Sequence, residues 1–163
     1  MKKGISLISL IITIVVIIIL ASITIVNSLN TSEDAYIVKN QNEFNDVCVF
    51  VRNVSTRVEA DLLSFEIPQE MLVTEEQLKE FIVEGSTELT SADIQKIKDV
   101  NSSASTKYGY YYITGDKIEN GITGLDFDSN ITNVDNNYII NFCYGVVIAK
   151  ISENQVNVMG TIK

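Results

Sequence analysis

The sequence predicts an α+β fold, and three observations lead to that class. An uncharged apolar run near the amino terminus is followed by an amphipathic helical pattern that extends to about Leu63. At Lys107 the pattern changes to aromatic and β-branched runs, which are typical of strands. The length of 163 residues suffices for one ordinary domain and little more.

The apolar run has the length of a membrane span. From Gly4 to Ser32 there are 29 consecutive residues without a charge, and Ile, Val and Leu dominate residues 5–26. A bilayer core of about 30 Å requires about 20 apolar helical residues. The sequence therefore predicts a transmembrane or filament-core helix over residues 5–29. Lys2 and Lys3 are the only charged residues ahead of it, so we expect a cytoplasmic N-terminus and an exported remainder.

The remainder of the chain is acidic. Between Glu33 and Lys163 lie 10 basic residues and all 21 acidic ones, which gives a net charge of −11. Nucleic acids and anionic lipid surfaces would repel such a body, so no nucleic-acid partner is expected.

An amphipathic helix is predicted from roughly Ser32 to Leu63, either continuous with the apolar helix or restarting near Thr31. Its apolar stripe consists of Phe44, Cys48, Val51, Ser55, Val58 and Leu62, flanked by Val47 and Val54, and its polar side includes Glu43 and Glu59. A coiled coil is the alternative, but Cys and Ser fill a coiled-coil seam poorly. We expect this helix to pack against a sheet, and Pro68 to follow its end.

Short helices are predicted in an insertion over residues 69–105. Thr74 and Gln77 have the spacing of a capping box, and the helix that they open is expected to close at Gly85. A second helix is expected to start near Thr90 or Ser91. It would bury Ile94, Ile97 and Val100.

Residues 107–163 predict an antiparallel sheet of about four strands. The four runs are KYGYYYIT, GITGLDF, NYIINFCYGVVIAKI and QVNVMGTI, with turns at Gly115-Asp116 and at residues 152–154. We expect the third run to be one long strand. Ile140 and Ile148 would share one face, and the smaller Gly145, Val147 and Ala149 would share the other, where the long helix can lie close.

The first residues, KKG followed by ISLISL and a long aliphatic run, resemble the N-termini of type IV pilins and of type II secretion pseudopilins. The resemblance implies that a prepilin peptidase cuts after Gly4 and that Ile5, the new first residue, is N-methylated. It also implies a pilin lollipop, in which a long N-terminal helix is half in the membrane and half packed on a globular head. GYYYITGDKIENGITGLDFD and YIINFCYGVV are similar to the C-terminal domains of pilin-like proteins from Gram-positive anaerobes.

One residue departs from the pilin pattern. The fifth residue of the processed chain is usually Glu in that family, whereas here it is Ser9. The family's carboxylate pairs with the terminal amine of a neighbouring subunit, so its absence favours a minor or diverged subunit. Ser6, Ser9 and Thr13 fall on one helix face and are expected to pack against neighbouring helices, although such hydroxyls also bond back to their own helix.

The resemblance implies a structural subunit and not an enzyme. Its domains would be a leader (1–4), the filament-core helix (5–29) and an exported head (32–163). Its partners would be the prepilin peptidase, other pilin or pseudopilin subunits and the membrane. It would be a single-pass membrane protein with an extracellular C-terminal domain, reaching the filament or cell surface after processing. The alternative is an uncleaved, membrane-anchored surface protein whose extracellular domain binds a ligand.

The residues give little support for catalysis, a cofactor or a metal. The chain has no His, no glycine-rich phosphate loop and no nucleophile beside an evident base. Asp126, Asp128, Asn130 and Thr132 alternate as calcium ligands do, but Ile131 and Asn137 occupy the positions that require Gly and Glu, so a polar turn is the better interpretation. Cys48 and Cys143 either form a disulfide or are buried separately. The tyrosines from Tyr108 to Tyr112 form either a binding surface or part of the core.

Overall fold

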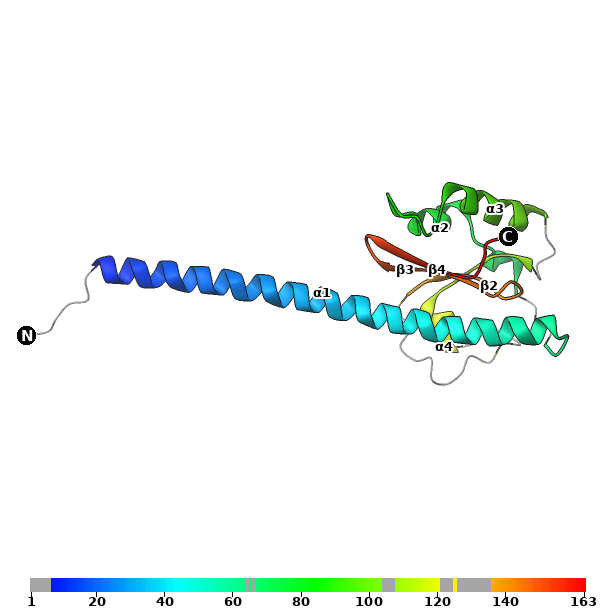
Figure 1. Ribbon diagram of the computed structural model, residues 1–163, viewed down its shortest axis with the longest axis horizontal. Helices are drawn as coiled ribbons and strands as arrows, with labels where there is room; N and C mark the ends of the chain where they lie inside the picture. Colours follow the sequence, from blue (N-terminus) through cyan, green and yellow to red (C-terminus); the bar gives the residue numbers. More distant parts are fainter. Residues whose placement is uncertain (1–6, 64, 66, 104–107, 121–124, 126–135) are drawn as a thin grey trace, which may run out of the picture. The chain divides into compact units, whose positions relative to one another are not determined.

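The computed structural model describes residues 7–63, 65, 67–103, 108–120, 125 and 136–163; within these ranges the side chains of 7–9, 23–30 and 119–120 are left out (Figure 1). The chain divides into two compact units, 1–38 and 39–163. The predicted α+β class is confirmed, because the described residues form helices and a four-stranded antiparallel sheet.

Helix α1 runs from Leu7 to Glu59 without a break, so the predicted apolar and amphipathic helices are continuous. It stops four residues before Leu63, the expected end. The N–H of Asp61 donates to the carbonyl of Val58 and that of Leu62 to the carbonyl of Arg57, which closes the helix with Asp61 in the left-handed region at φ 55°. Leu62, expected on the buried stripe, therefore lies beyond the helix and is 74% exposed.

The sheet is a meander in the order β1-β2-β3-β4. Its strands are β1 (Tyr111–Ile113), β2 (Tyr138–Asn141), β3 (Val146–Ser152) and β4 (Gln155–Met159). Tyr111 pairs with Ile140, Ile140 with Val147, and Val147 with Met159. The expected tight turn at residues 152–154 joins β3 to β4. Of the expected GITGLDF strand only Leu125 is described, as a buried residue in an isolated bridge position.

The long third strand of the prediction was wrong, because the chain forms a hairpin there. Residues 142–145 turn, so β2 and β3 are separate antiparallel strands. The side-chain oxygen of Asn141 accepts the Tyr144 N–H at 2.8 Å, and Gly145 takes a left-handed φ of 63°. Folding back brings Ile140 opposite Val147, so the two side chains share one face of the sheet. The prediction had placed them on opposite faces.

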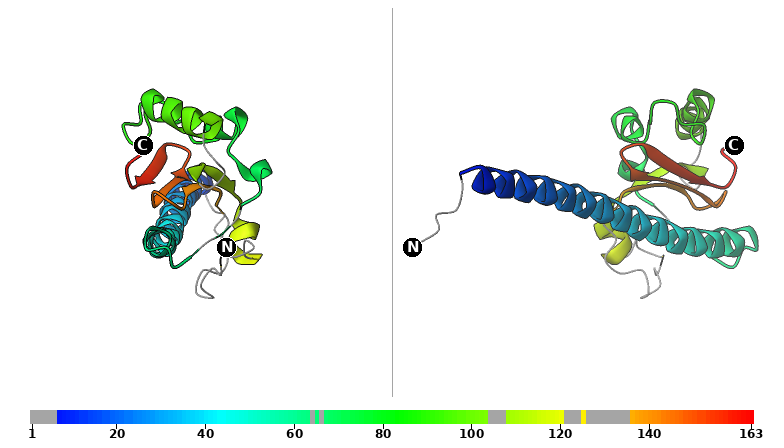
Figure 2. Two further views of the ribbon diagram at one scale, coloured as in Figure 1. Left: turned by 90° about the vertical axis from the view of Figure 1, so that its right-hand side faces the viewer. Right: turned by 60° about the vertical axis from the view of Figure 1, so that its left-hand side comes forward.

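Helices cover both faces of the sheet in the second unit (Figures 1 and 2). On one face lie α2 (Glu75–Glu80) and α3 (Ser91–Ser103), whose Leu78 and Ile97 join Ile139 and Ile148 in one hydrophobic cluster. On the other face lies the part of α1 from Lys39 onward. It buries Phe44, Val47, Cys48, Val51, Val54 and Val58.

The predicted insertion contains the expected helices. The capping box of α2 is confirmed, since the N–H of Gln77 donates to the Thr74 hydroxyl and Gln77 accepts the Thr74 N–H. However, α2 ends at Glu80, well before Gly85. A 3-10 turn, η1 (Gln69–Met71), precedes α2, and α4 (Gly115–Asn120) replaces the predicted turn at Gly115-Asp116.

Two polar side chains of α1 hold the helix on the sheet. Asn40 Nδ2 donates to the carbonyl of Ile151 at 2.8 Å, and Glu43 Oε1 accepts the N–H of Asn136 at 3.1 Å and the Tyr138 hydroxyl at 2.7 Å. Asn136 and Ile151 stand opposite each other when the Tyr138–Ala149 register is continued by two residues. Glu43 had been expected on the polar side, yet it is only 8% exposed, because these two donors compensate the burial of its carboxylate.

Candidate functional site

The first unit presents a continuous aliphatic surface along α1. Leu10, Ile11, Ile12, Ile14, Val15, Val16, Ile17, Ile18, Ile19 and Leu20 are all between 47% and 59% exposed. Consecutive residues of a helix point in all directions around its axis, so the apolar surface is not confined to one face. Single exposed apolar residues are common on protein surfaces, whereas a contiguous exposed aliphatic stretch of this extent is unusual.

The predicted processing and packing residues fall between positions 4 and 13 of the sequence. Gly4, Ile5 and Ser6 are outside the described residues, and Ser9 is described only as part of helix α1. Thr13 is an exposed residue of α1, four positions after Ser9 and therefore on the same side of the helix. The proposed cleavage, methylation and helix packing thus remain predictions.

The described residues contain neither a membrane-spanning helix nor a cluster of metal ligands. No helix among them is long and apolar enough to cross a membrane. No group of three or more His, Cys, Asp or Glu side chains that would hold a metal ion occurs in that same part of the chain. Asp126, Asp128, Asn130 and Thr132 lie outside it.

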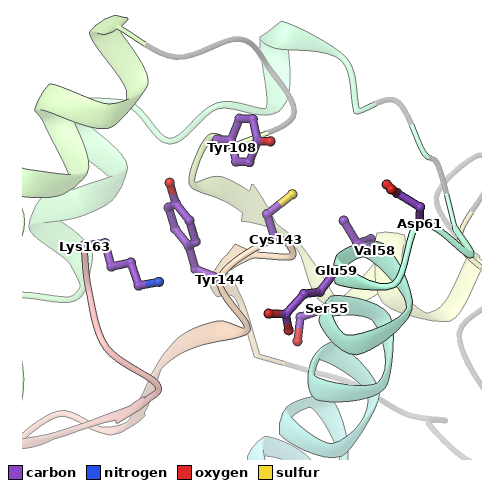
Figure 3. A pocket seen from close by; sticks show the side chains of 8 residues that line it. All are labelled: Ser55, Val58, Glu59, Asp61, Tyr108, Cys143, Tyr144 and Lys163. Carbon is purple, nitrogen blue, oxygen red and sulfur yellow. The ribbon is translucent and has the colours of Figure 1, made fainter.

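The second unit contains a half-open pocket of about 420 Å³, in the size range of small-ligand sites (Figure 3). Four segments that are distant in the sequence form it: the end of α1, the residue Tyr108 ahead of β1, the β2–β3 turn, and Lys163. Its lining residues are Ser55, Val58, Glu59, Asp61, Tyr108, Cys143, Tyr144 and Lys163.

Two tyrosines and a lysine form one side of the pocket. The ring centroids of Tyr108 and Tyr144 are 6.1 Å apart with the ring planes tilted by 32°, and the ammonium of Lys163 lies 4.9 Å from the Tyr144 centroid. This is a cation–π distance. The backbone around Lys163 is held by two hydrogen bonds, from Lys96 Nζ to the Ile162 carbonyl and from the Lys163 N–H to the Tyr110 hydroxyl.

Two carboxylates, Glu59 and Asp61, line the pocket from the end of α1, and in Figure 3 they lie across it from Lys163. Asp61 occupies the left-handed position that ends the helix, where Gly is the usual residue and an ordinary side chain costs about 1–2 kcal/mol. With Lys163 as the one cation of the lining, the side chains carry two acidic groups against one basic group.

The two thiols have different surroundings, and they do not form a disulfide with each other. Cys143 lines the pocket between the tyrosines and the carboxylates (Figure 3). Cys48 lies on the buried, sheet-facing side of α1, and burial raises the pKa of its thiol to about 12, so this thiol stays protonated at neutral pH.

Sequence reasoning found one side of this pocket in part and missed the rest. Of the tyrosines considered for a binding surface, Tyr110 and Tyr111 are buried in the core, whereas Tyr108 is 42% exposed. No sequence signal connected Tyr108 with Glu59, Asp61 or Lys163, because the four segments meet only after the hairpin has formed.

Comparison with known proteins returned no match: no family model, no curated protein and no solved structure is similar to this chain.

Proposed function

We propose that the chain is a structural, pilin-like subunit, either a pseudopilin or a minor pilin, that assembles through its apolar helix into a type IV-like filament or pseudopilus. In this proposal the apolar part of α1 is first held in the membrane with its N-terminus in the cytoplasm. A prepilin peptidase then cuts after Gly4, and the processed subunit joins other pilins, its amphipathic half carrying the exported head in the lollipop arrangement.

The observation that carries the proposal is the exposed aliphatic segment of α1. Ten large aliphatic side chains between Leu10 and Leu20 are about half exposed. At about 25 cal/mol per Å² of apolar surface, leaving such a segment in water is costly, so lipid or other subunits must cover it. A filament core made of such helices provides that cover after the subunit leaves the bilayer.

The sequence at the N-terminus adds support. The short basic leader, the glycine at position 4 and the uncharged run to Ser32 occur in the order that prepilin processing requires. By contrast, the long uncharged run exceeds the 7–15 apolar residues of an ordinary secretory signal peptide.

Mass spectrometry of the N-terminus tests the processing step. In a cell that makes a prepilin peptidase, the mature chain should begin at Ile5, with or without an N-methyl group. Gly4→Leu should leave the precursor uncut, whereas Lys2→Arg, which keeps the leader charge, should be processed normally. A wild-type chain that still starts at Met1 in such a cell would contradict the proposal.

Ser9 indicates whether this chain is a major or a minor subunit of the fibre. Without a glutamate at this position, each buried terminal amine in a fibre of identical subunits would lack a charge-assisted partner. We therefore expect incorporation in minor amounts among other pilins, and better incorporation of Ser9→Glu. Quantitative immunoblotting of purified fibres measures the amount of the wild-type chain and of the Ser9→Glu variant. Fibres made predominantly of the wild-type chain would refute the minor role.

The second candidate is an uncleaved, membrane-anchored surface protein that binds an external ligand. The pocket beside Tyr108 and Asp61 favours it, since a pocket of this size is not needed for assembly. An uncleaved N-terminus together with ligand binding by the head would favour this second function over the filament role.

A further inference from the structure

We infer that the pocket at the end of α1 binds an organic ammonium group, either that of a small alkylammonium compound or that of a lysine side chain on a partner protein. The inference does not rest on assembly into a filament, since the pocket lies wholly within the second unit.

The aromatic side of the pocket already holds an ammonium. Lys163 Nζ lies 4.9 Å from the centre of the Tyr144 ring, so the π-face of that ring is turned to a cation of the chain itself. The neighbouring Tyr108 ring is 42% exposed and tilted by only 32° from the Tyr144 ring. It therefore offers a second aromatic surface next to the one that Lys163 occupies. A ligand cation within about 6 Å of such a ring is attracted by its quadrupole.

The charges of the lining favour one further cation. Glu59 and Asp61 contribute two carboxylates and Lys163 one ammonium, so one carboxylate has no cationic counterpart within the lining. Figure 3 shows the helix-end residues on one side of the pocket and Tyr144 with Lys163 on the other. A bound cation would therefore have carboxylates on one side of the pocket and an aromatic ring on the other. Anionic ligands would meet two like charges.

The size and openness of the pocket fit this ligand class. Its volume of about 420 Å³ exceeds the space that one ammonium group requires, and Glu59, Asp61 and Tyr108 of its lining are exposed to solvent. A group carried on a short alkyl chain can enter, with the methylene groups against Val58 and the tyrosine rings. Both a free alkylammonium compound and a lysine of a docked protein satisfy these conditions.

Cys143 provides a direct assay because its thiol lines the pocket. The full chain in detergent micelles is treated with a maleimide at pH 7.5, and the rate of Cys143 modification is followed by mass spectrometry. Cys48 is the internal control: it is buried and its thiol pKa is raised to about 12, so it should react only after unfolding. Choline and acetyl-lysine methylamide serve as probes. The control ligand is the neutral isostere of choline, in which carbon replaces nitrogen.

We expect at least one of the two cationic probes to slow Cys143 modification several-fold, and the neutral isostere to have no effect. Protection by choline assigns the site to a free alkylammonium compound. Protection by acetyl-lysine methylamide alone assigns it to a lysine of a partner protein. Equal protection by the neutral isostere, or no protection by either cation, overturns the inference.

Three variants make the test specific. Asp61→Asn keeps the size of the side chain and tolerates the left-handed backbone, yet it should abolish protection because the charge is lost. Glu153→Gln makes the same change of charge on an exposed turn outside the pocket and should leave protection unchanged. Lys163→Gln should tighten binding several-fold, because it frees the Tyr144 ring and removes the competing cation. Weaker cation binding in Lys163→Gln overturns the inference, and circular dichroism confirms that each variant is folded.

Discussion

At the scale of single residues, Glu43 is the feature that sequence reasoning misjudged most. Its place among charged positions of an amphipathic helix predicted solvent, whereas the structure buries it against β2. Burial raises the pKa of Tyr138, and the hydrogen bond to the Glu43 carboxylate adds to the effect, so the phenol remains a donor at any ordinary pH. The partners, Asn136 and Tyr138, are more than 90 residues away in the chain, and no helical periodicity reveals them.

Glu43→Ala is expected to lower the free energy of unfolding by about 2–5 kcal/mol, because it leaves the Tyr138 hydroxyl and the Asn136 N–H without their buried acceptor. Urea unfolding followed by circular dichroism measures the change. Glu84→Ala, at an exposed position, is the matched control and should change the stability by less than about 0.5 kcal/mol. Equal stabilities of the two variants would mean that Glu43 does not hold α1 on the sheet.

Two glycines allow backbone strain to be separated from steric contact. Gly85 and Gly160 both have left-handed φ angles, of 80° and 88°, but only Gly160 lacks room for a Cβ, which would lie 2.8 Å from the Gly145 carbonyl oxygen. Gly85→Ala should cost about 1–2 kcal/mol from backbone strain alone. Gly160→Ala should cost roughly 1–3 kcal/mol more, because β4 and the hairpin turn must move apart. Thermal unfolding of the two variants measures the difference, and equal losses would argue that the turn yields freely.

At the scale of elements, α1, α2 and α3 were predictable from local patterns, whereas α4 and the division of the third predicted strand into β2 and β3 were not. The capping box of α2 and the apolar spacing of α3 are local signals, and the structure confirms both. The β2–β3 hairpin depends on one side-chain bond within Asn141–Tyr144 and on the left-handed Gly145, in a run otherwise rich in strand-forming residues. Because β-branched and aromatic residues continue on both sides, the run appeared to be a single strand.

The buried stripe of α1 gives the sharpest test at this scale. Val51→Asp places an unpaired charge at a position that is 0% exposed, between helix and sheet, and should destabilise the second unit by about 4 kcal/mol or more. Val49→Asp makes the same substitution two residues earlier on the same helix, where the side chain is 61% exposed, and should be nearly neutral. Chemical denaturation of both variants compares them. Similar stability of the two would show that the stripe does not face the sheet.

At the scale of the whole molecule, the two units are expected to differ in their tendency to associate in water. A chain that begins at Ser32 lacks the aliphatic segment and retains the helix–sheet core of residues 39–163. It should be a soluble monomer with the circular dichroism of an α+β protein. The full chain without detergent should associate, because its ten exposed aliphatic side chains remain uncovered. Size-exclusion chromatography with light scattering compares them, and association of the shortened chain would locate the contact surface in the head.

The hydrogen bond between Glu43 and the backbone of Asn136 has a consequence for amide exchange. An amide just before a strand normally exchanges with solvent as the strand end frays. Here the N–H of Asn136 is held by a helix side chain, while Asn40 of the same helix occupies the carbonyl of Ile151 on the opposite strand. Deuterium uptake at Asn136 therefore requires α1 to leave the sheet. The exchange rate of the Asn136 amide under native conditions thus reports how often the helix separates from the strands that it covers.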